Sequence, residues 1–234
     1  MEKQGLYLPE FEHDNCGAGF ICSLKGKKSN DIIHKALEIL EKLEHRGAVS
    51  ADGKTGDGAG ILIDIPHEFF REECPFELPH PGSYAVGNVF LPQRENQRDF
   101  CVQLFGENLR KQGLKLLGWR DVPVNRRVPG RIAAETEPFV KQVFVGKSEA
   151  AQEAFEFERK LFVARKVTEH AVLASGLSER GYFYLPSLST RIIIFKGLLM
   201  PIDIKLYYKD LMDPRVVTRL ALVHQRFSTN TFPT

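Results

Sequence analysis

Asn15-Cys16-Gly17-Ala18-Gly19-Phe20-Ile21-Cys22 (residues 15–22) decides the fold, because it sets a cysteine and a glycine at the start of an apolar run of strand length. The fifteen residues before Cys16 are interpreted as a removable leader. Once they are removed, a thiol and a free α-amino group share one carbon skeleton. A thiolate is a strong nucleophile, and an α-amino group titrates at about 7.7–8.0, where a general base works well. Cys16 is therefore a candidate for both roles, although a lone cysteine on a strand is more commonly a small buried hydrophobe.

The composition describes a globular chain with room for one domain or at most two. Of its 234 residues 43% are apolar, and the formal net charge is +2. Basic residues are scattered, so we predict neither a nucleic-acid partner nor a membrane surface. The N-terminus lacks an apolar signal core, and no stretch reaches the roughly eighteen apolar residues of a membrane span. The cysteines, at positions 16, 22, 74 and 101, have no metal-binding spacing. We therefore predict no metal site, free thiols and a cytoplasmic location.

Strand and helix patterns are interspersed along the chain, and the predicted class is α+β with stacked layers. Strands are expected over residues 17–24, 61–65, 84–90, 114–119, 139–145, 191–195, 204–208 and 219–224. Helices are expected over residues 31–45, 98–112 and 149–170, with a further short helix starting at Asp213-Pro214. Ser29 or Asn30 is the candidate cap of the first helix, and Gly47 suits its end. Phe155 and Phe162 of the third helix are predicted to pack in the core.

The glycine-rich stretch of residues 53–60 leads into a strand. A phosphate-binding loop would follow a strand and open a helix, which is the reverse order. We therefore expect these glycines to let the backbone pass close to another element. Asp52 and Asp57 are interpreted as turn carboxylates that bond their own backbone.

Three segments combine into one candidate site. They are Cys16-Gly17, residues 43–52 with the run Glu44-His45-Arg46-Gly47, and residues 224–231 (HQRFSTNT). Arg46 and Arg226, with clustered hydroxyl and amide donors, predict a pocket for a small molecule bearing a carboxylate, since Arg offers a planar, bidentate fork. For Arg46, an interaction with the C-terminal end of its own helix is an equal alternative. For His224, a packed neutral imidazole is favoured over a catalytic one.

At these residues the sequence resembles the class II glutamine amidotransferases, which belong to the N-terminal nucleophile hydrolases. The resemblance rests on Cys-Gly behind a leader, on the His-Arg-Gly element and on the string RFSTNTFP at residues 226–233. It extends along the whole chain and is strongest toward the amidotransferase domain of glutamate synthase large subunits. In those domains residues 188–191, 195–199 and 208–211 also have counterparts.

The resemblance implies a reaction, a site and a fold. Residues 1–15 would be removed, and Cys16 would attack the side-chain amide of L-glutamine, releasing ammonia and then glutamate. Arg226 would hold the substrate α-carboxylate with Thr229 donating nearby, and Arg46 would shape the pocket beside the nucleophile. The fold would be a four-layer αββα sandwich over residues 16–234, with a family-specific insert at about 66–185.

The resemblance also implies features that lie outside this chain. An Asn-Gly oxyanion hole would follow Thr234, so we expect the domain to be incomplete at its C-terminus and weakly active or inactive alone. FMN and an iron–sulfur cluster would belong to the full-length enzyme, with no cofactor in this chain. The expected partners are the remainder of the synthase chain and a small reductase subunit. Two alternatives stay open: a catalytically silent amidotransferase-like domain, and the glutaminase domain of a purine- or hexosamine-pathway enzyme, against which the long insert argues.

Overall fold

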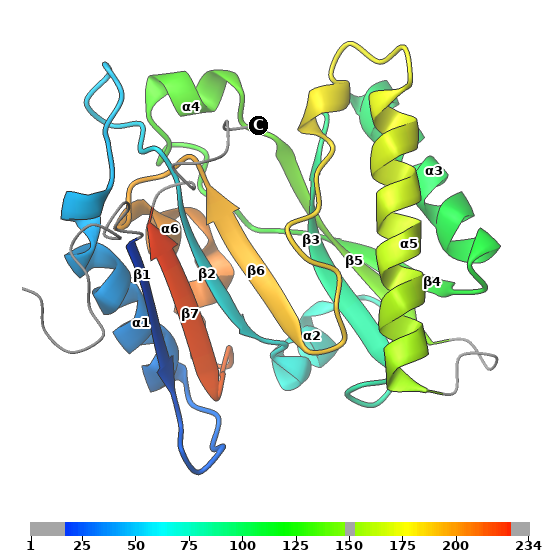
Figure 1. Cartoon of the computed structure of the whole chain (residues 1–234), viewed down its shortest axis with the longest axis horizontal. Coiled ribbons are helices and arrows are strands. Elements are labelled where there is room, and N and C mark those ends of the chain that lie inside the picture. The colour runs from blue at the N-terminus through cyan, green and yellow to red at the C-terminus, as the bar shows by residue number, and fades with distance from the viewer. Residues whose placement is uncertain (1–16, 148–152, 226–234) are drawn as a thin grey trace, which may run out of the picture.

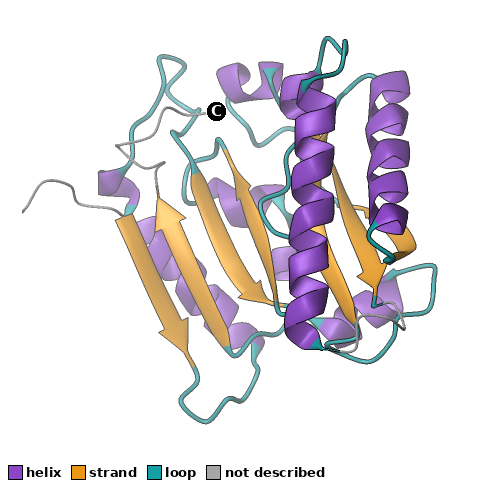
Figure 2. Ribbon diagram, turned by 45° about the vertical axis from the view of Figure 1, so that its right-hand side comes forward, coloured by secondary structure: helices purple, strands orange, loops and turns teal. Residues whose placement is uncertain are grey.

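The computed structural model describes residues 17–147 and 153–225, which form two antiparallel sheets flanked by helices (Figures 1 and 2). This mixed architecture confirms the predicted α+β class. Within the described ranges, no helix is long and apolar enough to cross a membrane. The elements are β1 (Gly17–Cys22), α1 (Asn30–Lys42), the 3-10 turn η2 (Glu44–Arg46), β2 (Ala59–Asp64), α2 (His67–Glu73), β3 (Tyr84–Leu91), α3 (Glu95–Lys111), β4 (Lys115–Asp121), α4 (Arg131–Glu135), β5 (Phe139–Gly146), α5 (Ala154–Leu173), η3 (Arg180–Tyr182), β6 (Ile192–Gly197), α6 (Asp203–Tyr207), η4 (Lys209–Met212) and β7 (Leu220–Gln225).

The four-stranded sheet has the order β1-β7-β2-β6, and each neighbouring pair is antiparallel. Its first two strands come from opposite ends of the described chain. Helix α1 covers one face of this sheet, behind β1 and β7 in Figure 1. Because side chains alternate along a strand, Ala221 and Val223 of β7 face α1 and join its buried Ile33, Leu37 and Leu40 in one core.

The three-stranded sheet has the order β3-β5-β4 and lies wholly within residues 66–185. Helices α3 and α5 pack against each other and against this sheet, in front of it in Figure 2. The segment that leads into β6 joins the two sheets, because it bridges to β3 at Val86↔Ser189 and Phe90↔Tyr184. The region predicted as an insert therefore builds a sheet of its own that adjoins the first.

A buried ion pair connects the three-stranded sheet to the turn η4. The Arg120 guanidinium on β4 donates to both carboxylate oxygens of Asp210, at 2.7 and 3.0 Å. The same guanidinium donates to Gln142 Oε1 at 2.9 Å. Arg120 and Asp210 are 8% and 4% exposed, so this pair is held away from solvent.

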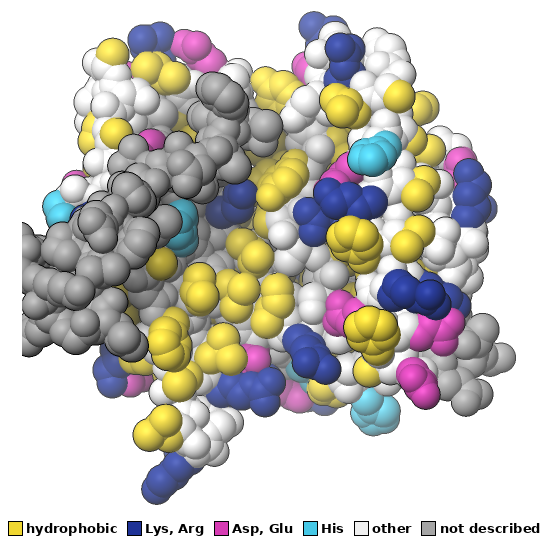
Figure 3. All heavy atoms as spheres, in the orientation of Figure 1, with side chains coloured by type: hydrophobic (Ala, Val, Ile, Leu, Met, Phe, Trp, Pro, Cys, Tyr) yellow, Lys and Arg dark blue, Asp and Glu magenta, His cyan; other side chains and the backbone are white. Residues whose placement is uncertain are grey.

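The face of the four-stranded sheet opposite α1 carries a row of apolar side chains. Phe20 is 71% exposed and Leu222 45% exposed, while Leu62 and Ile194 are half-buried. These four residues are successive register partners across β1, β7, β2 and β6. Figure 3 shows apolar side chains gathered over this part of the molecule. We refer to this surface, Phe20, Leu222, Leu62 and Ile194, as the open face.

The first helix begins and ends differently from the prediction. Ser29 makes no side-chain cap, and Asn30 Nδ2 instead donates to the carbonyl oxygens of Asp213 and Val216 at 3.2 and 2.8 Å. Helix α1 ends at Lys42, and η2 continues the coil. Gly47 has φ −91°, so it does not adopt the left-handed conformation of a helix-ending glycine.

Two further predictions of secondary structure are wrong. Residues 204–208, expected as a strand, lie mostly in the short helix α6, which buries Ile204 and Tyr207 on one side. No helix begins at Asp213, because Arg215 folds back on it: Arg215 N–H and Nε both donate to Asp213 Oδ1, at 2.9 and 3.0 Å.

The apolar stripe of α5 also differs from the one expected. Phe155 and Phe162, predicted to be core residues, are 82% and 58% exposed. The helix turns another face toward the core, because its buried residues are Phe157, Leu161, Ala164, Thr168 and Val172.

Candidate active site

The start of β1 and the end of β7 meet at one end of the four-stranded sheet. Gly17 lies directly opposite Gln225 in the register. Gly17 is bonded to Cys16, and Gln225 is bonded to Arg226, so the register joins two of the three predicted segments. Cys16, Arg226 and Thr229 themselves lie outside the described residues.

The two glycines of the predicted motifs are needed for space. A Cβ atom on Gly17 would lie 3.0 Å from Arg46 Cβ and 3.1 Å from the carbonyl oxygen of Gln225. A Cβ atom on Gly47 would overlap Gln225 Nε2 and lie 3.1 Å from Asp57 Oδ1. Neither glycine has a positive φ, so conformational freedom is not the reason for either. Gly17 and Gly47 therefore belong to one packing arrangement around the side chain of Gln225.

Arg46 is the predicted binding residue that falls within the described ranges. It ends η2, is half-buried, and lies beside Gly17. Among the described residues its guanidinium forms no hydrogen bond or ion pair. The end of α1 is contacted instead by His45, whose Nδ1 lies 3.0 Å from the carbonyl oxygen of Lys42. The alternative role of Arg46 at its own helix end is therefore not adopted.

The loop before β2 is held in place by a turn carboxylate and a close backbone contact. Asp52 accepts the backbone N–H of Thr55 at 2.8 Å, which confirms the prediction for this residue, and also accepts the N–H of Ile132 at 3.0 Å. The hydrogen bond from the Ile132 backbone, followed by those from Thr55, holds the pKa of the Asp52 carboxyl below its ordinary value. A Cβ on Gly56 would overlap the backbone of Leu199. The expected close approach of the glycine-rich stretch is thus confirmed.

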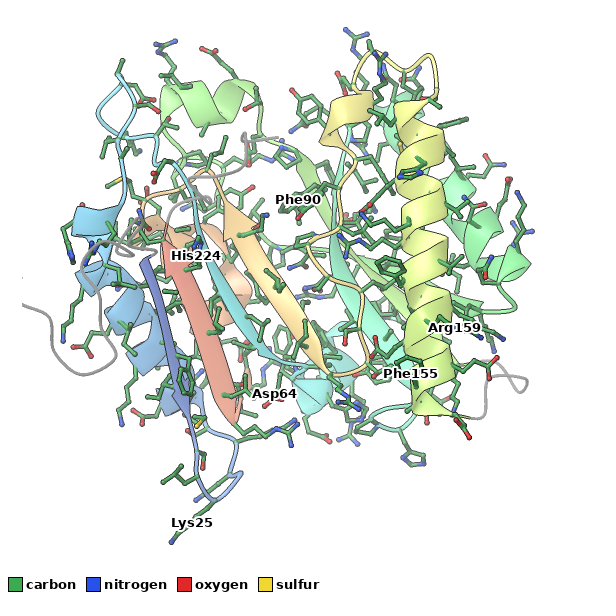
Figure 4. The ribbon with its side chains drawn as sticks, in the orientation of Figure 1. Lys25, Asp64, Phe90, Phe155, Arg159 and His224 are labelled. Atoms are coloured by element: carbon green, nitrogen blue, oxygen red, sulfur yellow. The ribbon has the colours of Figure 1, made fainter. Side chains whose placement is uncertain are left out.

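His224 lies near the same end of the sheet, on the side of the open face, while Asp64 lies at the opposite end (Figure 4). It borders a hollow of about 200 Å³, together with Gly60, Lys196 and Leu222. Burial, with Lys196 adding to it, lowers the pKa of His224. The imidazole is therefore neutral at pH 7, as predicted for a packed histidine.

Cys22, Cys74 and Cys101, the described cysteines, are free thiols. Burial raises the pKa of Cys74 and of Cys101 to about 11, so both are protonated and unreactive at neutral pH. Cys22 is exposed, because alternation along β1 places it on the same side as Phe20. Within the described ranges, no three His, Cys, Asp or Glu side chains gather as metal ligands.

Sequence reasoning missed Gln225 as a structural centre of this site. Its position held a usable signal, because Ala221, Val223 and Gln225 alternate onto the face that α1 covers. A glutamine in such a position is a buried polar side chain in an apolar row, and that is the unusual observation.

The sheet ends, the two close-packed glycines and Arg46, whose guanidinium has no partner among the described residues, lie where the sequence motifs predicted a site. The family described as class-II glutamine amidotransferases matches residues 16–234, and the chain belongs to that family. Among curated proteins, the chain is 47% identical over 232 residues to the glutamate synthase [NADPH] large chain of Bacillus subtilis (strain 168), covering 99% of this chain and 15% of that protein.

The glutamate synthases to which the chain is similar include NADPH, NADH and ferredoxin-dependent enzymes. The chain is 41% identical to glutamate synthase [NADH] of Saccharomyces cerevisiae (strain ATCC 204508 / S288c), covering 99% of this chain and 11% of that protein. It is 37% identical to ferredoxin-dependent glutamate synthase 2 of Synechocystis sp. (strain ATCC 27184 / PCC 6803 / Kazusa), covering 95% of this chain and 14% of that protein. The chain therefore spans only a small part of the length of these relatives.

Proposed function

We propose that residues 16–234 are the glutamine-hydrolysing domain of a glutamate synthase and that Cys16 is its nucleophile after residues 1–15 are removed. The observation that carries this proposal is the Gly17↔Gln225 pairing, which brings the residues bonded to Cys16 and Arg226 together beside Arg46. The class-II family match and the 36–47% identity to glutamate synthases support the same reaction.

In the proposed reaction the Cys16 thiolate attacks the side-chain amide carbon of glutamine. The α-amino group of Cys16 takes the thiol proton and returns a proton to the departing nitrogen, so ammonia leaves and a thioester forms. Water then attacks the thioester, and glutamate is released. Two of the described thiols are poor alternatives as nucleophile, because burial keeps Cys74 and Cys101 protonated at neutral pH.

The substrate is proposed to be held by arginine. Arg226 binds the α-carboxylate of glutamine, and Thr229 donates to the same end of the substrate. Arg46 shapes the pocket from the other side of Gly17, and its lack of a described partner supports a role for its guanidinium beyond the fold. A bidentate guanidinium–carboxylate contact gives the orientation that the attack on the amide requires.

The finer architecture is proposed to be the four-layer αββα sandwich. The open face supports this, because a row of exposed apolar side chains over a sheet marks a surface that another layer covers. In the parent protein a second sheet, contributed from outside this chain, would lie on that row. Burying a side chain such as Phe20 contributes about 1.5–3 kcal/mol.

The parent protein is proposed to use the ammonia to make a second glutamate from 2-oxoglutarate in the cytoplasm. Its FMN and iron–sulfur cluster would be bound outside this chain, and a small reductase subunit is a further proposed partner. Residues 66–185 are proposed to be a family-specific insert, which the self-contained β3-β5-β4 sheet supports. A silent amidotransferase-like domain and a purine- or hexosamine-pathway enzyme are not favoured, because the relatives named above are glutamate synthases.

The test is intact mass of the parent chain before and after exposure to an electrophilic glutamine analogue. We expect loss of residues 1–15 and one adduct on Cys16 that excess glutamine prevents. Cys22→Ala is the matched control, since this exposed thiol lies at the far end of β1 and its loss should leave labelling unchanged. Cys16→Ala should abolish labelling and lower glutamine hydrolysis by more than roughly 10³-fold. An uncut wild-type chain that takes no adduct would contradict the proposed function.

A further inference from the structure

A hollow of about 530 Å³ is lined by residues of both sheets. Its walls come from the end of β6, the end of β3, the start of β5 and the short elements α4, η3 and α6. Phe90, which is labelled in Figure 4, belongs to this lining. Sites for small molecules typically enclose roughly 300–1,000 Å³ and combine apolar walls with a few polar groups. The hollow therefore has the size of a small-molecule site.

Aromatic side chains form much of the lining. The rings of Phe90 and Tyr184 lie 6.0 Å apart at an interplanar angle of 35°. The rings of Tyr207 and Tyr208 meet edge to face at 4.8 Å, and Tyr182 also borders the hollow. Flat ligand rings stack on aromatic side chains such as these, and the contact tolerates many ring types. The walls therefore favour a planar, aromatic ligand.

Two of the three charged side chains in the described lining already have partners. The Lys196 ammonium donates to the hydroxyl of Tyr184 at 3.3 Å and lies 4.7 Å from the centre of that ring. The Glu179 carboxylate accepts the backbone N–H of Arg94 at 2.9 Å and pairs with Arg94 Nε at 3.2 Å. Arg94 therefore offsets the charge of Glu179, and Lys196 supplies the cation of the lining.

The third charged side chain, Glu137, is half-buried. Its Oε1 accepts the hydroxyl of Tyr207 at 2.8 Å. Among the described residues the carboxylate forms no ion pair. Because a carboxylate has about four acceptor positions, Glu137 keeps the capacity to accept further hydrogen bonds. It therefore provides an acceptor for an N–H group of a ligand in the hollow.

We propose that this hollow binds an uncharged heteroaromatic amine of nucleoside size, whose ring packs against Phe90 and whose amino group donates to Glu137. With Glu179 offset by Arg94, the lining carries one ammonium and one carboxylate. A phosphorylated ligand would bring its negative charge toward Glu137, and a cationic ligand would bring a positive charge toward Lys196. The inference does not rest on the proposed function, because binding is measured without turnover.

The experiment is isothermal titration calorimetry of the parent chain with two uncharged probes, adenosine and cytidine, each of which carries an exocyclic amine. We expect binding that Glu137→Gln weakens by roughly tenfold or more, because hydrogen bonds to charged groups are the stronger ones. Phe90→Leu should weaken binding by roughly fivefold or more through loss of stacking. Glu135→Gln is the matched control, since this exposed carboxylate of α4 lies outside the lining and its loss should leave affinity unchanged.

A second series tests the chemistry of the ligand. Purine riboside, which is adenosine without its amine, should bind more weakly than adenosine and should be insensitive to Glu137→Gln. Adenosine monophosphate should also bind more weakly than adenosine, because its phosphate adds negative charge near Glu137. A monophosphate that binds as tightly as adenosine, through the same residues, would overturn the assignment of an uncharged ligand.

Three outcomes would overturn the proposal itself. If neither nucleoside binds at millimolar concentration, the hollow is not such a site, and this is also the result expected if a segment of the parent chain fills it. Binding that both Phe90→Leu and Glu137→Gln leave unchanged lies elsewhere in the parent chain. If Phe90→Leu does not fold, as judged by circular dichroism, Glu137→Gln decides alone. That variant keeps the side-chain length and an acceptor for Tyr207, so an unchanged affinity for both nucleosides refutes the role of the carboxylate.

Discussion

Replacing Gly47 with alanine should damage the fold and the site together. The added Cβ would overlap Gln225 Nε2 and lie 3.1 Å from both Gln225 Cδ and Asp57 Oδ1. Real Cβ atoms do not approach another heavy atom within 3.0 Å, so the glutamine amide or the loop must move. The backbone of Gly47 is extended in ψ at φ −91°, which alanine adopts freely, so the whole effect is steric.

The expected cost follows from the kind of contact that is lost. Overfilling a packed region costs about 1–3 kcal/mol, and turning Gln225 away from its rotamer contributes about 0.5–1.5 kcal/mol of that. For a chain of this size, each kcal/mol corresponds to roughly 2–4 °C in Tm. We therefore expect Gly47→Ala to lower Tm by about 2–12 °C, with a fall in kcat because the loop that carries Arg46 is displaced.

The assay is thermal and urea unfolding of Gly47→Ala beside Gly176→Ala, with a double-mutant cycle through Gln225→Ala. Gly176 is the matched control, because a Cβ there meets nothing within 4 Å, and its alanine variant should gain about 0.4–1 kcal/mol through the unfolded state. Shortening Gln225 removes the atoms that the new Cβ strikes, so the two changes should couple by about 1 kcal/mol or more. Additive effects, or a Gly47→Ala variant as stable as Gly176→Ala, would refute the steric argument.

Two further predictions concern stability. Asp210→Leu leaves the Arg120 guanidinium buried without its bidentate partner and should lower the free energy of unfolding by about 3–5 kcal/mol. Combining Asp210→Leu with Arg120→Met should recover most of that loss. Urea unfolding midpoints measure both variants, and a double variant no more stable than the single one would contradict the reasoning. Since burial lowers the folded-state pKa of His224, the unfolded chain binds that proton more readily, and stability is lost as pH falls through about 6.5. His224→Gln should therefore lose less stability than wild type between pH 7 and 5 in the same assay, and parallel losses would sink this explanation.

The apolar strands were predictable because their signal is local. The strands at 17–24, 61–65 and 219–224 were placed to within a few residues, since each is an apolar run bounded by turn residues. Residues 204–208 were misassigned because their isoleucine, leucine and two tyrosines, interrupted by one lysine, have strand propensity and also fit one turn of helix. Tertiary packing decides such cases, and here it buries Ile204 and Tyr207 together.

The choice of buried face on α5 could not be made from the sequence. Phe155 and Phe162 share one face, and Phe157, Leu161 and Ala164 share another at equally helical spacing. Periodicity alone cannot choose between two apolar stripes, and the smaller side chains of the second face fit against α3 and the sheet.

The sequence motifs predicted which residues belong to the candidate site, but not which of them lie in contact. Arg46 was chosen for its chemistry, and the structure places it beside Gly17. Gly47 was interpreted as a helix end, because a glycine after a helix usually has that role, while its actual neighbour is Gln225. That contact joins residues from distant parts of the chain, and no local pattern encodes it.

The pairing of β1 with β7 also fixes when the site can exist during folding. Gly17 and Gln225 are the first and last described residues, so their ladder closes the longest loop among the described strand pairings. Contacts of such separation form late, because the entropy of loop closure must be overcome before they contribute. The three-stranded sheet, by contrast, is assembled from neighbouring segments. In a partly synthesised or partly folded chain, Gly17 and Gln225 are therefore still apart, and the candidate site around Gly17, Arg46 and Gly47 is assembled only once this ladder has formed.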